Sequence, residues 1–234
     1  MQKINLKLNE YDWYVYLRDE ADQSVYNEVF KLKEYRSADE VIASAKNVIV
    51  DVGAHAGFFT MRCRSLNKKV KIYAIEPEPD NLKMLKQHLI ENKISGVKVI
   101  SGALAEQTES RQLIVSADSH NHRLAPHMFR GDEDEEKTIS IKAFSFADFC
   151  KENKIKKISL LKMDIEGGEY ELFAGMSADD FAVVNYVILE YHRGSQYKIL
   201  AEKLRENGFG VQVFPSHFDK TMGFIWANNK RFKS

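Results

Sequence analysis

A glycine-rich turn offers the first residues with the types and spacing for chemistry. In the phrase NVIVDVGAHAGFFT, Asp51 ends a buried apolar run and a helix begins a few residues later. Glycine lets the backbone approach a ligand closely, and the first turn of a helix presents unpaired N–H groups. We expect Asp51 to receive the polar end of such a ligand or to cap the turn. The other residues expected to line a cofactor site here are Gly53, Ala54, His55, Gly57 and Phe58.

The spacing of these glycines excludes two common nucleotide motifs. The dinucleotide fingerprint G-x-G-x-x-G, started at Gly53, needs glycine where the chain has His55 and Phe58. A P-loop needs Gly-Lys-Ser or Gly-Lys-Thr, and neither follows. The pattern D-x-G-x-x-x-G instead resembles motif I of class I methyltransferases, and a turn without a ligand is the alternative.

An acidic residue ends the next apolar run. Glu76 stands where a carboxylate can accept both hydroxyl protons of a ribose, and we expect it and the following Pro77 to line the cofactor site. The alternative is an acid favoured by the dipole of the following helix. After the third run, the small residues Ser101, Gly102 and Ala103 leave room for a flat heterocycle, although tight packing would select the same residues.

A third group of charged residues closes the fourth run. Lys162, Asp164 and Glu166 alternate along LLKMDIEGGEYELFAG, so they point toward one side of a strand end. Ligands of open α/β sheets bind beyond the carboxyl ends of the strands. We expect these residues, with His192 after the fifth run, to serve as catalytic groups, and Asp164 also to contact the cofactor. A buried ion-pair network is the alternative.

The elements that position these residues alternate between strands and helices. Short apolar runs separated by amphipathic helices predict a doubly wound, mostly parallel seven-stranded α/β sheet. The runs are NVIVDV, VKIYAIE, VKVISGA, ISLLKMDI, YVILEYH, FGVQVF and MGFIWA. The predicted helices cover Phe58 to Ser65, Asp80 to Asn92, Phe146 to Glu152, Glu169 to Phe173, and Gln196 to Glu206.

An extension over residues 1–45 precedes this domain, which covers 46–234. Residues Ile4 to Leu8 and Trp13 to Leu17 predict a hairpin around an Asn9-Glu10 turn, serving as a dimer contact or as a lid. Two helices should follow, with Ser24 and Ser37 as N-caps.

One segment, from about Ser116 to Glu136, breaks the alternation and predicts a long irregular insertion. Its histidines, His120, His122 and His127, are expected to be solvated loop residues, with a role as base left open. A metal held by Asp118, His120 and His122 lacks a firm ligand spacing, so we expect no metal.

The amino-acid composition limits the classes of partner and the cellular environment that we expect for this chain. The 234 residues carry 34 basic and 34 acidic side chains, which gives no basic footprint for nucleic acid. Two cysteines, Cys63 and Cys150, favour a reducing cytoplasm over a disulfide framework, and no apolar run is long enough for a membrane span.

The motifs together resemble the FkbM family of methyltransferases over roughly residues 25–192. The resemblance rests on DVGAHAGFFT, EPEPDNLKMLKQHLIEN, ALAE, KMDIEGGEYELFAG and VILEYH, in that order. It implies a Rossmann-like fold, S-adenosylmethionine as methyl donor, and O-methylation of a sugar or other small natural product. Gly168 stands where the family often has alanine. The resemblance does not identify the acceptor.

Two rival functions remain. Enzymes that methylate amino groups of nucleic-acid bases resemble one another in an Asn-Pro-Pro-Tyr phrase, where this chain has Asp-Ile-Glu-Gly. A non-catalytic module that only binds the cofactor would show the same binding residues. Within the enzyme hypothesis, Asp164 and Glu166 are the leading bases, Lys162 supplies a neighbouring charge, and His192 is the alternative base.

Overall fold

A seven-stranded sheet forms the centre of the protein, in the order β12-β13-β11-β10-β3-β4-β5. The computed structural model describes residues 1–116, 122–125, 137–192, 194–216, 219 and 221–232. The strands that run parallel are β3 (Val48–Val52), β4 (Ile72–Glu76), β5 (Val97–Ser101), β10 (Ile158–Met163) and β11 (Val184–Tyr191). β13 (Gly223–Asn229) and β12 (Phe209–Pro215) complete one edge in antiparallel pairing. The predicted seven-stranded, mostly parallel sheet is confirmed.

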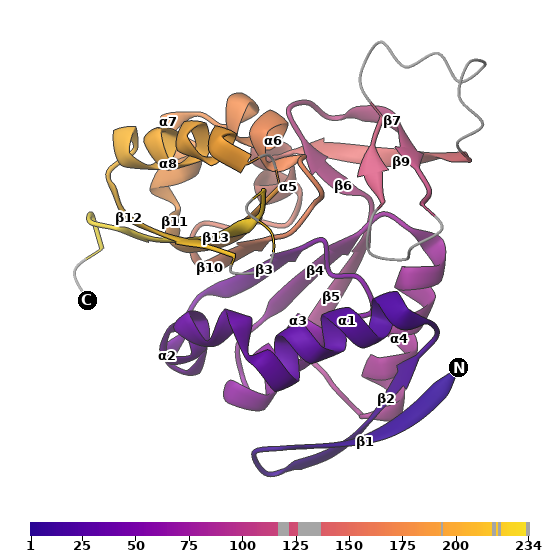
Figure 1. Cartoon of the computed structure of the whole chain (residues 1–234). Helices are drawn as coiled ribbons and strands as arrows, with labels where there is room; N and C mark the ends of the chain where they lie inside the picture. Colours follow the sequence, from indigo (N-terminus) through magenta and orange to yellow (C-terminus); the bar gives the residue numbers. More distant parts are fainter. Residues whose placement is uncertain (117–121, 126–136, 193, 217–218, 220, 233–234) are drawn as a thin grey trace.

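Helices cover both faces of this sheet (Figure 1). One layer holds α1 (Glu20–Tyr26), α2 (Asp39–Ser44), α3 (Phe58–Leu66) and α4 (Pro79–Glu91). The other holds α5 (Phe146–Glu152), α6 (Glu169–Gly175), α7 (Ala178–Ala182) and α8 (Tyr197–Glu206), preceded by the 3-10 turn η3 (Gly194–Gln196). No helix in the described part of the chain is long and apolar enough to cross a membrane.

The strands divide their side chains between these two layers. Val50 and Val52 pack with the cluster that contains α5–α8, whereas Ile49 packs with the cluster around α3. Because successive side chains of a strand point to opposite faces, Asp51 lies on the Ile49 side. The chemistry of that residue therefore depends on what covers the sheet there.

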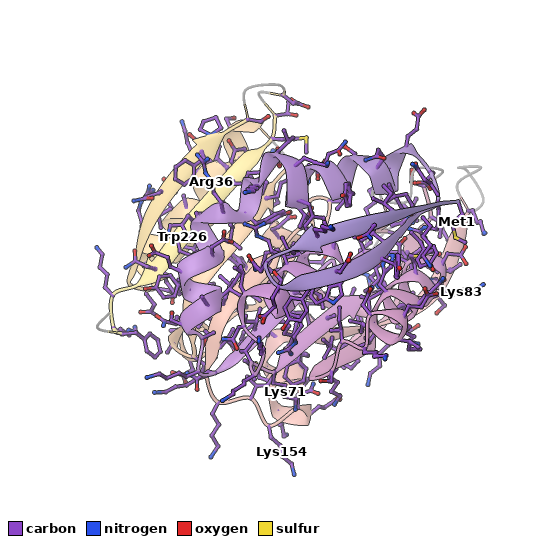
Figure 2. All side chains as sticks on the ribbon, turned by 90° about the horizontal axis from the view of Figure 1, so that it is seen from below. Met1, Arg36, Lys71, Lys83, Lys154 and Trp226 are labelled. Carbon is purple, nitrogen blue, oxygen red and sulfur yellow. The ribbon has the colours of Figure 1, made fainter. Side chains whose placement is uncertain are left out.

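The N-terminal hairpin consists of β1 (Gln2–Leu8) and β2 (Tyr11–Leu17), joined by the predicted Asn9-Glu10 turn. The backbone N–H of Tyr16 donates to Nε2 of His88 on α4 at 2.8 Å, and Asn92 bonds both backbone groups of Tyr14. Figure 2 looks at the molecule from the side of this hairpin and shows it lying across the helical layer, with Met1 at its free end. The hairpin is thereby attached to the main domain.

The segment between the hairpin and β3 differs from the prediction. Asp19, not Ser24, is the N-cap of α1, because its side chain accepts from the backbone N–H of Asp22 at 2.8 Å. The chain then widens into a π-helical turn, η1 (Asn27–Leu32), and a 3-10 turn, η2 (Glu34–Ala38), before α2. Ser37 lies inside η2, and α2 begins without a side-chain cap. These turns bring Tyr35 into the core, where it is 3% exposed.

A second sheet, of four strands, was not predicted. Its order is β6-β9-β7-β8, formed by β6 (Ala103–Ala105), β9 (Thr138–Ser145), β7 (Glu109–Ile114) and β8 (Arg123–Leu124). The third predicted run, VKVISGA, is split between the two sheets, because Gly102 has a φ of 149° and redirects the chain after Ser101. The predicted irregular insertion thus includes β8, and its residues 117–121 and 126–136 lie outside the described residues.

Candidate active site

A cavity of about 380 Å³ lies beyond the carboxyl ends of β3, β4, β10 and β11. Its walls come from the turn after β3, the end of β4, the start of β6, and the chain that follows β10 and β11. The N-terminal segment contributes Val25, Glu28, Val29 and Tyr35. No residue of β1 or β2 lines the cavity, so the hairpin does not cover it.

The turn after β3 needs glycine because another strand end approaches it. Gly53 has a φ of 74°, and a Cβ placed there would lie 1.8 Å from the backbone oxygen of Asp164. Gly53, Ala54, His55 and Phe58 line the cavity, as predicted. Gly57 does not; it has a φ of 89° and precedes α3, facing Leu85.

Glu76 lies at the end of β4, 4% exposed, and lines the same cavity. Its two carboxylate oxygens accept from the backbone N–H groups of His55 at 2.8 Å and Glu78 at 2.9 Å. Burial raises the pKa of Glu76 to about 7, against the lowering effect of those hydrogen bonds. Nδ2 of Asn81 donates a third, longer hydrogen bond, at 3.4 Å, to the oxygen that Glu78 contacts. Since a carboxylate has about four lone-pair sites, acceptor capacity remains beyond these three bonds.

The neighbours of Glu76 are divided between the inside and the outside of the cavity. Pro77, Gly102 and Ala103 line it, as predicted for a cofactor site. Ser101 does not; it is exposed on the outer side of β5, beside α4.

Asp51 lies beneath the cavity and is not among the residues that line it. Its carboxylate accepts from Thr60 Oγ1 at 2.7 Å, and its other oxygen lies 3.3 Å from Nζ of Lys162. Lys162 also donates to the backbone oxygen of Gly53 at 2.8 Å. Burial opposes the charge of Lys162, but Asp51 and Asp164 outweigh it and raise the pKa of the lysine. The pair connects β3 to β10 under the cavity floor.

A group of acidic side chains surrounds His192 at the other end of the cavity. Nε2 of His192 lies 3.7 Å from Asp164 and 3.6 Å from Glu166, and Nδ1 lies 3.3 Å from Glu169. Burial alone would lower the pKa of His192, but these three carboxylates raise it to about 10. Burial raises the pKa of Glu166 to about 7 and that of Glu190 well above its usual range. The predicted catalytic residues Lys162, Asp164, Glu166 and His192 therefore all line one cavity.

Three further residues, for which the sequence indicated no role, reach this end of the cavity through the fold. Glu190 lines the cavity beside His192, and Glu28 faces it from η1. The hydroxyl of Tyr35 donates to the carboxylate of Asp164 at 3.3 Å. The helical spacing of residues 24–35 indicated burial of an apolar face, but nothing in it indicated which strand end that face would meet.

Of the three loop histidines, His122 is described and lines the cavity. Its Nδ1 accepts from the backbone N–H of Ser116 at 3.0 Å. His120 and His127 lie outside the described residues, as does Asp118. The prediction for those three stays a prediction.

Comparison with known proteins gives matches that agree with this geometry. A family model described as "Methyltransferase FkbM domain" matches residues 51–220. Curated relatives include the hexuronic acid methyltransferase AglP of Haloferax volcanii, 24% identical over 198 residues, or 82% of this chain and 77% of that protein. The 31-O-demethyl-FK506 methyltransferase FkbM of Streptomyces tacrolimicus is 23% identical over 81% of this chain and 82% of its own length.

Solved structures show the same fold. A methyltransferase FkbM from Methylobacillus flagellatus superposes with a TM-score of 0.55 at 16% identity, covering 90% of this chain and 55% of that one. An rRNA methylase from Streptococcus thermophilus gives a TM-score of 0.53 at 9% identity, covering 84% of this chain and 96% of that one. At these identities the likeness concerns the fold alone.

Proposed function

The chain belongs to the FkbM methyltransferase family, and from that premise we propose that it transfers a methyl group from S-adenosylmethionine to a hydroxyl of a small molecule. The observation that supports this most is the cavity itself. It joins a buried strand-end carboxylate, Glu76, to a second group of carboxylates around His192. One end suits a nucleoside and the other suits proton transfer.

The donor end fits the nucleoside of S-adenosylmethionine. Glu76 is held rigidly by two backbone N–H groups and keeps lone pairs that can accept from the ribose hydroxyls. Gly53, Ala54 and His55 present backbone next to it, and the small residues Gly102 and Ala103 leave room for the adenine. When bound, S-adenosylmethionine would supply a methyl group on a positively charged sulfur, so that the acceptor oxygen bonds to the methyl carbon while the carbon–sulfur bond breaks and the sulfur leaves as a neutral thioether.

The acceptor end supplies groups that hold and deprotonate a hydroxyl. A hydroxyl is a poor nucleophile until its proton leaves, which requires a base within hydrogen-bond reach. Glu166 and Asp164 both face this end, and we assign the base to Glu166 and the orienting role to Asp164, which Tyr35 contacts. Lys162 acts as a positioning residue, since it contacts Asp51 and the Gly53 carbonyl beneath the floor.

A sugar or another small natural product is the acceptor class that we propose. The relatives named above act, by their names, on a hexuronic acid and on a demethylated FK506. The chain also has no excess of basic side chains to attract a nucleic acid.

The test is methyl transfer from labelled S-adenosylmethionine to a panel of sugars, polyketide-type alcohols and RNA. We expect label in a hydroxyl-bearing small molecule and none in RNA, and equal transfer by a control variant, Glu202→Gln, which removes an exposed carboxylate on α8. Donor binding measured by calorimetry without any transfer would instead support the cofactor-binding module. Label in RNA alone would overturn the acceptor class.

A further inference from the structure

Three metal-ligating side chains meet at the acceptor end of the cavity. Asp164, Glu190 and His192 each offer one ligand atom, and these atoms lie within 4.8 Å of one another. Asp164 follows β10, and the other two lie at the end of β11, its parallel neighbour in the sheet (Figure 1). Three atoms that bind one ion at roughly 2.0–2.2 Å lie about 3–3.7 Å from one another. Binding an ion would therefore draw the more widely separated of these atoms together by about 1 Å.

His192 shows an independent sign of a missing partner. Its side chain is 10% exposed, and neither buried ring nitrogen makes a hydrogen bond of normal geometry within the described residues, although three carboxylates lie 3.3–3.7 Å away. Buried polar side-chain atoms are ordinarily hydrogen-bonded, so an exception requires an explanation such as an ion. The Nε2 atom faces both Asp164, at 3.7 Å, and Glu166, at 3.6 Å.

Glu169 supports the other side of the same ring. Its side chain is fully buried, its Oε1 accepts from the backbone N–H of Ile165 at 3.1 Å, and the same atom lies 3.3 Å from Nδ1 of His192. Histidines that bind metals almost always direct their second ring nitrogen to a carboxylate or carbonyl, which fixes the ring. This arrangement leaves Nε2 for an ion.

We propose that Asp164, Glu190 and His192 bind a divalent metal ion at the acceptor end of the cavity. Two carboxylates and one imidazole suit manganese or zinc. Three protein ligands leave coordination positions open toward the cavity, as in catalytic metal sites. An acceptor hydroxyl that occupies such a position becomes easier to deprotonate. This last role rests on the proposed function, whereas ion binding does not.

Nothing in the sequence indicated this metal site, because the residues that form it are separated in the chain. The ligands come from two separate strand ends, so no short motif contains all three. The loop set considered from the sequence, Asp118, His120 and His122, is a different one.

Binding of Mn²⁺ to the full-length, chelator-treated protein tests the site without any methyl transfer. Electron paramagnetic resonance of Mn²⁺ should show one bound ion per chain. Glu190→Gln and Asp164→Asn, two nearly isosteric changes, should each weaken binding at least about tenfold. The matched control is Glu28→Gln, which removes the same charge from the same cavity but no ligand. It should weaken binding no more than about threefold, the range of a distant charge effect.

Absence of bound Mn²⁺ in the wild type, or equal weakening by Glu28→Gln and Glu190→Gln, would overturn the metal site. Circular dichroism of each variant separates loss of folding from loss of a ligand. The two proposals fail separately. If the protein transfers methyl groups but binds no Mn²⁺, the proposed function stands and the metal site is wrong. If it binds Mn²⁺ but transfers no methyl group to any acceptor, the metal site stands and the proposed function is wrong.

Discussion

Asp51 and Lys162 are partners on adjacent strands, with the lysine Nζ 3.3 Å from the carboxylate and both side chains almost fully buried. Lys162 also bonds the carbonyl of Gly53, so this pair holds the turn after β3 against β10. The pair thus supports the floor of the cavity. Lys162 lines the cavity, whereas Asp51 lies beneath it.

Breaking this pair should cost stability. Lys162→Met leaves the Asp51 carboxylate buried without its cation, and we expect a loss of about 3–5 kcal/mol in the free energy of unfolding. Urea denaturation measures it. The control is Lys68→Met, which breaks the exposed pair with Glu10 and should leave the urea midpoint almost unchanged. Equal costs for the two variants would mean that Lys162 does not stabilise the strand ends.

The buried carboxyl of Glu76 should make stability depend on pH. Its pKa is about 7 in the folded protein and 4.5 ordinarily, so the unfolded chain releases this proton first as pH rises. The Glu76 contribution to stability therefore falls between pH 4.5 and 7 and stays at its lowest above 7, a change of about 3 kcal/mol. Glu76→Gln lacks this titration, so its stability relative to wild type should rise from pH 4.5 to 8. Parallel urea profiles for the two proteins would contradict the assignment.

Donor affinity should depend on the same residue. Removing the carboxylate in Glu76→Ala deletes charged hydrogen bonds to the ribose, each worth about 1.5–3 kcal/mol, so calorimetric affinity for S-adenosylmethionine should fall at least about tenfold. Glu202→Gln on the exposed side of α8 should bind like wild type. Unchanged affinity in Glu76→Ala would remove this residue from the donor site.

Turnover should separate the two acceptor-end carboxylates. Glu166→Gln removes the proposed base, and we expect kcat to fall by about 10²–10⁴ with little change in donor affinity. Asp164→Asn, which removes the orienting group, should lower turnover less at saturating metal. If Glu166→Gln keeps the wild-type kcat, or if Asp164→Asn lowers kcat more than Glu166→Gln does, Asp164 is the base instead.

Gly53 should tolerate no side chain. Gly53→Ala would place a Cβ 1.8 Å from the Asp164 backbone oxygen, in a backbone region with a φ of 74°. Gly194 is the matched control, because its φ is 52° but the nearest atom to its Cβ would be 3.9 Å away. Gly194→Ala should cost about 1–2 kcal/mol from backbone strain alone. Gly53→Ala should cost about 3 kcal/mol more, measured by thermal unfolding.

Several elements could be predicted because their signals are local. Continuous apolar runs identified the strands of the main sheet, since strands covered on both faces need apolar side chains at every position. The second sheet was not predicted because β6 pairs with β9, and β7 and β8 separate these two strands in the sequence. The predicted N-cap of α1 was wrong. Aspartate and serine are both favourable N-cap residues, so the sequence alone does not distinguish Asp19 from Ser24, and the backbone conformation decides for Asp19.

The sequence by itself determined the alternation of strands and helices and the strand ends at which Glu76, Lys162 and Asp164 would stand. Period-two geometry is local, so it also indicated that Lys162, Asp164 and Glu166 point toward one side of their strand end. Only the tertiary structure decided that Asp51 contacts Lys162 below the floor, and that Tyr35 and Glu190 join Asp164. Those contacts join segments far apart in the chain, and their distances depend on how β10 and β11 pair and on how the N-terminal turns pack.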